Sequence, residues 1–201
     1  MSADDDLEHM EGLEVSGCSR CPDLVESRRR IVNGTGPEDP DVLFVGEAPG
    51  EQEDEEGTPF VGRSGDVLDD VLGEYGLPRS DVRITNCVRC RPPENRDPTD
   101  EELANCRPHL EHEIDLVDPE VIVTLGKVPS QHLLGRDVAV TKEAGTVETV
   151  EIAGERHDVL VCVHPAATLY DRSQRETFEK TIEKAATIAG AEGGQSTFGD
   201  F

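Results

Sequence analysis

The feature that most constrains this chain is a short apolar run that ends in a glycine-rich segment. Residues 42–45 are Val-Leu-Phe-Val, an uninterrupted apolar stretch typical of a strand buried on both faces of a parallel sheet. The run breaks into Gly46-Glu47-Ala48-Pro49-Gly50, where a strand would end. In open α/β sheets, ligands bind at the carboxyl ends of the strands, and glycines let the backbone approach a ligand closely. The segment is therefore predicted to be a ligand-binding loop.

Similar apolar segments alternate with amphipathic patterns along the rest of the chain. The sequence predicts buried strands over residues 42–45, 82–88, 121–125 and 159–163, and a hairpin over 147–159 that closes near Gly154. Helices are expected around 67–72, from a capping box at Thr99 and Glu102 to about 117, over 126–134 and over 173–188. Strands that alternate with helices indicate a parallel sheet covered on both faces. We therefore expect a three-layer α/β/α fold with a central, four-stranded, mainly parallel sheet.

A length of 201 residues without an internal repeat fits one domain. We expect a flexible acidic leader over residues 1–12, a single domain over 13–190 and a flexible tail over 191–201. No apolar run reaches the roughly 20 residues of a membrane span. The acidic amino terminus also differs from a signal peptide, so the sequence predicts a cytoplasmic protein without a membrane partner.

The net charge of -25, from 44 acidic and 19 basic residues, ordinarily argues against a nucleic-acid partner. The acidic residues are, however, spread along the whole chain instead of forming one tail. This distribution is typical of a protein kept soluble at high salt, where the screening length falls to about 3 Å at 1 M. We interpret the charge as the mark of a halophilic source, with a disordered acidic protein as the alternative.

Three predicted strands end in polar side chains, which are Glu47, Asn86 and His164. Taken singly, each has a structural interpretation, as a solvated carboxylate, a turn-forming amide and a hydrogen-bonding imidazole. Because the ends of parallel strands meet at one edge of a sheet, we expect the three groups to converge. A carboxylate, an amide and an imidazole together suit an enzyme that acts on a planar polar ligand.

The six cysteines indicate a metal site more than disulfides, since a reducing compartment keeps thiols free. Cys18 and Cys21 form one CxxC pair, and Cys87 and Cys90 form another. Two such pairs fit a tetrahedral zinc site about as well as an iron-sulfur cluster. The spacing alone leaves both alternatives open.

Three motifs, taken together, carry a resemblance to a known family. They are Gly46-Glu47-Ala48-Pro49-Gly50 with Glu53-Asp54, Gly57, Pro59-Phe60-Val61-Gly62 and Gly65; Thr85-Asn86 with Cys90-Arg91-Pro92-Pro93 and Asn95-Arg96; and His164-Pro165-Ala166. In combination they resemble the iron-sulfur uracil-DNA glycosylases of bacteria and archaea, often called family 4. The match runs from about Cys18 to Lys184. Glu47 favours this branch over the second iron-sulfur branch, whose first motif lacks the glutamate.

The resemblance implies an enzyme that flips uracil out of DNA, hydrolyses its N-glycosidic bond and leaves an abasic site for base-excision repair. In the base pocket, Gly46 would be one of the substrate-binding residues and Phe60 would stack on the base. Asn86 would hydrogen-bond the uracil edge and reject cytosine. Glu53 would lie against C5 and exclude the methyl group of thymine.

Two residues would carry the chemistry that the resemblance implies. Glu47 would orient the attacking water and stabilise an oxocarbenium-like sugar. His164 would donate to uracil O2 as negative charge develops on the departing base. Two alternatives stay open, a non-catalytic nucleic-acid-binding module that contains a metal such as zinc, and a relative in the same superfamily with altered base choice.

The resemblance also selects a ligand set, namely Cys18, Cys21, Cys90 and Cys106 around a [4Fe-4S] cluster. It leaves Cys87 facing the core and Cys162 buried in the last strand. A structural or DNA-positioning role is expected for the cluster, because hydrolysis requires no electron.

Contacts to uracil-containing DNA, single- or double-stranded, must come from local basic groups. We expect Arg89, Arg91, Arg96 and Arg107 to meet phosphates, and we interpret 28–30, three arginines in a row, as a solvated helix face. The tail, with Gln195, Phe198 and Phe201, resembles a sliding-clamp binding peptide, with a frayed terminus as the alternative. The protein is expected to be a monomer.

Overall fold

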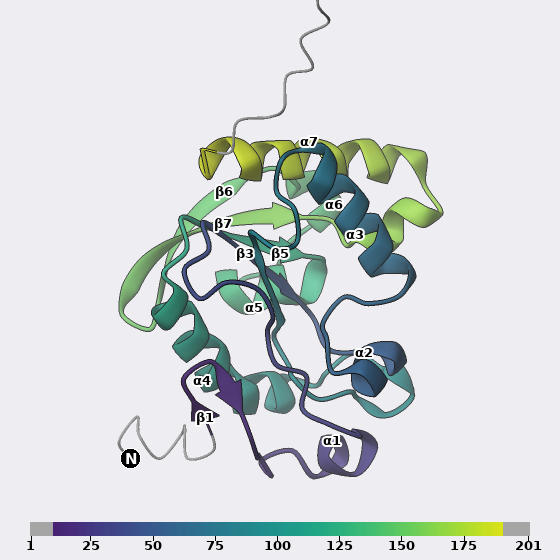
Figure 1. Ribbon diagram of the computed structural model, residues 1–201, viewed down its shortest axis with the longest axis vertical. Coiled ribbons are helices and arrows are strands. Elements are labelled where there is room, and N and C mark those ends of the chain that lie inside the picture. Colours follow the sequence, from purple (N-terminus) through teal and green to yellow (C-terminus); the bar gives the residue numbers. More distant parts are fainter. Residues whose placement is uncertain (1–9, 191–201) are drawn as a thin grey trace, which may run out of the picture.

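Four parallel strands and one antiparallel strand form the central sheet of the protein, which a computed structural model describes for residues 10–190 (Figure 1). The strands are β1 (Met10–Glu11), β2 (Glu14–Val15), β3 (Val42–Gly46), β4 (Arg83–Asn86), β5 (Val121–Leu125), β6 (Val147–Ile152) and β7 (Glu155–Cys162). The helices are α1 (Pro22–Ser27), α2 (Glu51–Glu56), α3 (Arg63–Glu74), α4 (Asp100–Val117), α5 (Lys127–Leu134), α6 (Val140–Glu143) and α7 (Arg172–Ile188). Two short 3-10 helices are η2 (Pro93–Asn95) and η3 (Pro165–Leu169).

The strand order is β4-β3-β5-β7-β6, and β1 pairs with β2 in a separate two-stranded sheet. The four expected buried strands are present and run parallel, which confirms the α/β fold. The expected strand count of four is wrong for the sheet as a whole, because the hairpin adds β6 to the sheet. The second arm of the hairpin and the fourth expected strand form one continuous strand, β7. This strand pairs with β5 on one side and with β6 on the other.

Helices cover the two faces of the sheet with two separate apolar layers. On one face, α3 and α7 pack against inward side chains such as Phe44, Val123 and Leu160. On the other face, α4 and α5 pack against side chains that include Leu43, Val45 and Ile122. In the view of Figure 1, α7 lies above the sheet and α4 below it. The expected three-layer arrangement is therefore confirmed.

The chain crosses from β3 to β4 on one side and later returns to β5 on the other side of β3. In doubly wound sheets, such a reversal of direction opens a crevice at the carboxyl ends of the strands, and ligands bind there. The glycine-rich loop after β3 lies at this point. The topology therefore positions the segment that the sequence singled out.

Local interactions explain where two of the helices begin. The predicted capping box starts α4, because the Thr99 hydroxyl accepts the Glu102 N–H at 3.2 Å and the Glu102 carboxylate accepts the Thr99 N–H at 2.8 Å. The other example is α2, which follows the glycine-rich loop at a place where the sequence does not predict a helix. There the Glu53 carboxylate accepts the Gly50 N–H at 3.1 Å and satisfies one of the free donors at the helix start.

The linker before β3 covers the outer edge of β4. Thr35 and Ile84 form an isolated antiparallel bridge, in which each N–H donates to the other residue's carbonyl oxygen, at 2.9 and 2.8 Å. Because β4 is the first strand in the sheet order, this bridge occupies backbone groups that would otherwise face solvent.

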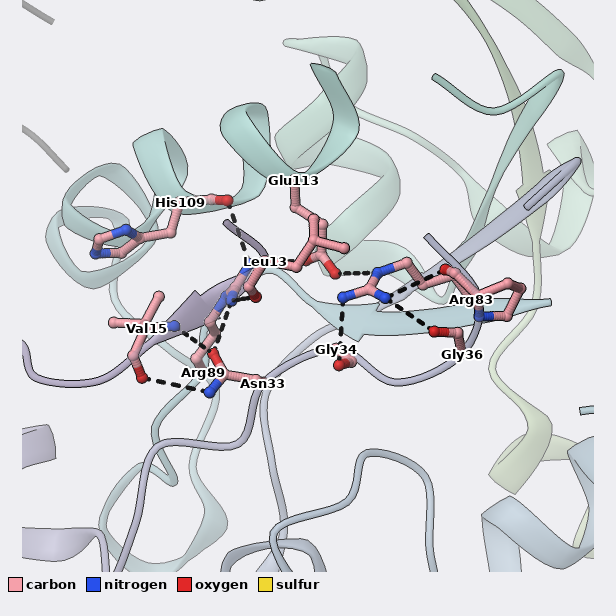
Figure 2. A network of polar contacts seen from close by, with 10 residues as sticks. Leu13, Val15, Asn33, Gly34, Gly36, Arg83, Arg89, His109 and Glu113 are labelled. Carbon is pink, nitrogen blue, oxygen red and sulfur yellow. Dashed lines mark hydrogen bonds and ion pairs between the residues drawn. The ribbon is translucent and has the colours of Figure 1, made fainter. Parts of the chain in front are cut away.

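A buried ionic network ties β4 to α4 and to the amino-terminal segment (Figure 2). The Glu113 carboxylate, which has no solvent exposure, accepts from Arg83 Nε at 2.6 Å and from an Arg89 guanidinium nitrogen at 2.7 Å. Arg89 also donates to the Asn33 side chain at 2.9 Å and to the Leu13 carbonyl at 3.3 Å. Segments far apart in the sequence therefore meet at one buried carboxylate.

Several sequence-based expectations concern residues beyond the described range. Gln195, Phe198 and Phe201 lie outside the described residues, as do the first nine residues of the expected leader. Residues 10–12, also assigned to the leader, belong to β1 and its turn. Within residues 10–190, no helix combines the length and the apolar character that a membrane crossing requires.

Candidate active site

Three strand ends converge on a pocket of about 220 Å³. Its lining residues come from the loop after β3, from α2, from the segment 57–64 and from the ends of β4 and β7. They are Glu47, Ala48, Gly50, Glu53, Phe60, Ser64, Asn86 and His164. The expected convergence of carboxylate, amide and imidazole is therefore present. A pocket of this size suits one planar base, since pockets for drug-sized ligands hold roughly 300–1,000 Å³.

Gly46 lies beneath this pocket, at the last position of β3. It pairs in register with Asn86, and a Cβ atom at this position would collide with the Asn86 side-chain oxygen and with the Phe60 ring. The absence of a side chain therefore lets the amide and the aromatic ring approach each other. Gly46 differs from the other predicted site residues, because its contribution depends on having no side chain.

The Phe60 ring is held by strained backbone. Phe60 has a φ of 52°, a left-handed conformation that is unusual for a residue with a bulky side chain. Arg79 holds this loop, because its guanidinium donates to the carbonyl oxygens of Pro59 and Phe60 and pairs with Asp69 at 2.7 Å. The ring centre lies 5.7 Å from that of His164, at an interplanar angle of 33°.

Asn86 and Glu53 present polar groups of different kinds to the pocket. The Asn86 side chain is almost fully buried and lines the pocket. It therefore offers a donor and an acceptor to a bound base. The Glu53 carboxylate is partly engaged, since it accepts the Gly50 N–H, and burial raises its pKa.

The Glu47 carboxyl group lies beside a second acid. Burial raises the pKa of Glu47 to about 7, and the negative charge of Asp97 and a hydrogen bond to its carboxylate add to the increase. Asp97 follows η2 in the loop after β4 and is exposed. Glu47 therefore changes its charge near neutral pH, which suits a general base.

The position of the proton on His164 follows from one backbone contact. The Ala166 N–H donates to Nδ1 of His164 at 3.1 Å, so the neutral imidazole carries its proton on Nε2. Burial lowers the pKa of His164 to about 4, which keeps the ring neutral at ordinary pH. His164 is therefore a neutral hydrogen-bond donor to the pocket.

A larger hollow, of about 470 Å³, lies between the start of α4 and α5. Its lining includes Asp97, Arg107 and His132 but none of the residues predicted to bind the base. The carboxylate, amide, imidazole and aromatic groups that the sequence singled out line the smaller pocket instead. The two hollows are neighbours, since Asp97 reaches Glu47 from the larger one.

Cys18, Cys21, Cys90 and Cys106 come from the loop before α1, the segment after β4 and the middle of α4. Burial raises the pKa of the last three thiols, and an electrostatic interaction with Cys18 adds to the increase at each of them. Cys87 and Cys162 are fully buried in the two apolar layers, one in each. Cys162 lies in the layer away from the proposed ligands, whereas Cys87 shares its layer with Cys90 and lies near Cys106.

The surroundings of the four thiols bear on the cluster that the resemblance implies. Within residues 10–190, no group of three or more His, Cys, Asp or Glu side chains is arranged to hold a metal ion. The donor chemistry fits a cluster, because hydrogen bonds reach Cys90 from Arg28 at 2.9 Å, Cys21 from Asn105 at 3.6 Å and Cys106 from a backbone N–H. Such bonds stabilise thiolates, which are the form that ligates iron.

The expected phosphate contacts need one correction. Arg89 is almost fully buried and bound to Glu113, so it cannot reach DNA. Its position within a basic loop suggested exposure, but a carboxylate 24 positions later in the chain holds it inside. Arg91, Arg96 and Arg107 are more exposed, and each contacts an acidic side chain, at 3.8, 2.7 and 2.6 Å respectively.

Sequence reasoning missed three residues that support these sites. Arg79 holds the Phe60 loop, Asp97 contacts Glu47, and Arg28 bonds Cys90. The helix α1 ends at Ser27, so Arg28 does not belong to a solvated helix face as expected. No sequence pattern around these three residues indicates the partner that each one contacts. Only Asp97 could have been suspected of belonging to the site, because it directly follows the Asn95-Arg96 motif.

Comparisons with known proteins agree with this geometry. The model of the Uracil DNA glycosylase superfamily matches residues 33–186. The chain is 39% identical over 181 residues to a protein of Archaeoglobus fulgidus named Type-4 uracil-DNA glycosylase, which covers 88% of this chain and 90% of the relative.

Two further relatives bear the same name. The one from Thermotoga maritima is 40% identical over 192 residues, covering 94% of this chain and 98% of the relative. The one from Saccharolobus solfataricus is 40% identical over 176 residues, covering 85% and 81%. The chain therefore belongs to the uracil-DNA glycosylase superfamily and, within it, to the type-4 uracil-DNA glycosylases.

Proposed function

We propose that this glycosylase receives a flipped uracil in the pocket at the end of β3 and hydrolyses its bond to deoxyribose. The single observation that carries the proposal is the convergence of Glu47, Asn86, Phe60 and His164 on one base-sized pocket. The products are free uracil and an abasic site in DNA, the starting point of base-excision repair. A flipped base must be read along its edge and stacked on its face, and the pocket offers groups for both tasks.

Recognition follows from the placement of the ring and the amide. Phe60 supplies an aromatic face, and the buried Asn86 amide supplies a donor and an acceptor that pair with the uracil edge. Cytosine carries an amine where uracil carries a carbonyl, so its edge would leave the amide mispaired. Glu53 lines the same pocket, and we assign it to the C5 side, where a carboxylate excludes the methyl group of thymine.

The chemical step divides between two residues. The C1′–N1 bond breaks, its electron pair leaves with the base, and the Nε2–H of neutral His164 stabilises the negative charge that develops on O2. The Glu47 carboxylate stabilises the electron-poor sugar and orients the water that attacks C1′. With a pKa near 7, it is also able to take up the proton that the water releases.

The test is release of uracil from an oligonucleotide that contains deoxyuridine, measured across potassium chloride concentrations. We expect the native chain to excise uracil, the Glu47→Ala variant to lose most of that activity, and Glu56→Ala to retain it. Glu56 is a suitable control because it is an exposed glutamate of the neighbouring helix α2. A folded, cluster-loaded native chain that released no uracil would favour the non-catalytic binding module, and preferential release of another base would favour altered base choice.

We also propose that Cys18, Cys21, Cys90 and Cys106 ligate a [4Fe-4S] cluster. When bound, the group supplies no step of the hydrolysis and instead joins the amino-terminal segment to α4. Visible absorption and iron content of the purified protein test this assignment. Colourless protein with stoichiometric zinc would contradict it.

Further proposals concern the partners and the setting of the enzyme. We assign the tail, with Gln195, Phe198 and Phe201, to sliding-clamp binding by a monomer that works in a salt-rich cytoplasm, as the dispersed acidic charge suggests. Substituting both phenylalanines by alanine should abolish binding to the clamp of the source organism without changing uracil release. Unchanged clamp binding by this double variant would remove the assignment.

A further inference from the structure

Arg28 differs from the two arginines that follow it in the chain. Its guanidinium is partly buried and makes two side-chain contacts at once, to the Cys90 sulfur at 2.9 Å and to the Cys18 carbonyl oxygen at 2.7 Å. Cys90 lies 62 positions away, in the segment after β4. One side chain therefore joins two of the segments that carry the proposed cluster ligands.

The other contacts to the ligand sulfurs come from neutral groups. The side-chain amide of Asn105 lies 3.6 Å from the Cys21 sulfur, and the backbone N–H of Arg89 donates to Cys106. Asn105 also exchanges two bonds with the backbone and side chain of Arg20, at 3.3 and 3.2 Å. Of the three donors to a ligand sulfur within residues 10–190, only Arg28 donates from a charged group. The Arg89 guanidinium also acts on Cys106, but through its charge and not through a hydrogen bond.

A guanidinium is charged at every pH at which the protein is folded, and its planar fork can hold two acceptors in fixed positions. Hydrogen bonds to a ligand sulfur, and positive charge beside it, favour the more negative, reduced state of an iron-sulfur cluster and so raise its reduction potential. The fork also restrains the loop that carries Cys18. The contact to the Cys90 sulfur therefore affects the reduction potential of the cluster, and the contact to the Cys18 carbonyl affects how firmly the iron is retained.

We propose that Arg28 is a positioning residue for the iron-sulfur cluster, raising its reduction potential through Cys90 and securing its retention through Cys18. This inference rests on the proposed cluster and goes beyond the choice of ligands. The role belongs to a residue that is neither a ligand nor a part of the base pocket.

The next residue in the chain provides a matched control. Arg29 carries the same charge, but its side chain is 61% exposed and pairs with Glu55 at 2.9 Å. Arg28→Gln and Arg29→Gln therefore change the net charge equally, and only the first removes a donor to sulfur. Arg28→Lys keeps the charge but cannot reproduce the fork.

The experiment compares the native chain with Arg28→Gln, Arg28→Lys and Arg29→Gln, all purified without oxygen and checked for fold by circular dichroism. Iron per chain, reduction potential by protein-film voltammetry and the rate of bleaching in air are measured. We expect Arg28→Gln to lower the potential and to bleach roughly tenfold faster, the size expected for one lost charge-assisted hydrogen bond. Arg29→Gln should match the native chain, and Arg28→Lys should recover the potential in part while still bleaching fast.

Equal potentials and equal bleaching rates for Arg28→Gln and Arg29→Gln, both loaded with iron, would overturn the role of Arg28 and leave the cluster intact. A native chain without iron would overturn the cluster and this role together. Neither result depends on uracil release, which is measured separately, so a failure here is distinguishable from a failure of the proposed reaction.

Discussion

Glu47 and Asp97 form a pair of carboxyl groups at the edge of the base pocket. Two neighbouring acids resist losing both protons, so the proton remains on one of them to a higher pH than usual. Here burial holds it on Glu47, whose pKa is raised to about 7, while Asp97 is exposed. Since the proposed mechanism requires the Glu47 carboxylate, uracil excision should rise as the pH increases through about 7.

The Asp97→Asn variant tests this pairing. The substitution removes the negative charge beside Glu47, which lowers the pKa of Glu47 and should shift the rising limb of the pH–rate profile to lower pH. His164 does not produce this limb, because its pKa of about 4 leaves it neutral throughout. Asp100→Asn is the control, since Asp100 is an exposed acid of the same region that does not contact Glu47. A profile that Asp97→Asn leaves in place would contradict the pairing.

Gly46 supports a second prediction at the residue scale. In Gly46→Ala, the added Cβ would occupy space now used by the Phe60 ring and the Asn86 oxygen. Displacing these groups should reduce uracil excision by a factor on the order of 100, as misplacements of about 1 Å do. Steady-state kinetics on a deoxyuridine oligonucleotide provides the measurement.

Gly73→Ala is the matched control for that experiment. Gly73 lies in α3 with helical backbone and open space around it, so alanine should leave excision unchanged and raise stability by roughly 0.5–1 kcal/mol. Native-like excision by Gly46→Ala would refute the close approach across Gly46.

At the scale of elements, the loop that carries Phe60 depends on an arginine outside it. Arg79→Ala removes the donors to the Pro59 and Phe60 carbonyls, so the strained φ of Phe60 would lose its restraint. We expect the KM for uracil-containing DNA to rise about tenfold, which corresponds to the loss of about one charge-assisted hydrogen bond. Steady-state kinetics of the native enzyme and the variant, at one salt concentration, measures this change in KM.

Asp69→Asn separates the loop contacts from the salt bridge. This variant loses the charge pair between Arg79 and Asp69 but keeps the bonds to the loop carbonyls. It should behave like the native enzyme, because partly exposed ion pairs contribute only about 0–1 kcal/mol. If both variants raised KM equally, the loop contacts would not be the cause.

The elements also show how far sequence reasoning reaches. The parallel strands and the site residues at their ends follow from apolar runs that stop at polar groups, as Glu47, Asn86 and His164 illustrate. Periodicity could not predict α2, because its only fully buried side chain is Asp54, which accepts backbone N–H groups of Arg29 and Arg30. The contacts between Asp54 and the segment after α1 hold α2 in place, and no pattern within residues 51–56 indicates that segment.

The same limit applies to β6 and to the buried arginines. A hairpin can be predicted from its own sequence, but its addition to the sheet depends on β7 also pairing with β5. Arg83 and Arg89 are typical surface residues by type, and their burial depends on the Glu113 carboxylate, the counter-charge that they share. Contacts between distant segments thus decided the features that the sequence did not reveal.

At the scale of the whole molecule, the Glu113 carboxylate at the centre of Figure 2 is a fully buried charge that joins distant segments of the chain. Glu113→Gln would leave two buried guanidinium groups without their counter-charge, which typically costs about 3–5 kcal/mol. We expect urea denaturation to show that the free energy of unfolding falls by this amount, with the unfolding transition shifted to lower urea concentration. A loss below about 1 kcal/mol would mean that the two arginines find other partners.

Glu111→Gln is the control on the same helix. Glu111 pairs with Arg107 at 2.6 Å but is partly exposed, so its removal should change the free energy of unfolding by no more than about 1 kcal/mol. The contrast between the two variants isolates the effect of burial from the effect of losing one negative charge.

The bridge between Thr35 and Ile84 has a consequence for how these molecules behave toward each other. An uncovered outer strand offers its backbone groups to a strand of a neighbouring molecule, and this is a common route to aggregation. Here the linker that follows the first cysteine pair occupies those groups on β4, the strand that presents Asn86 to the pocket. The segment that joins the cysteine motif to the sheet therefore also makes this part of the β4 edge less available to a strand of a second molecule.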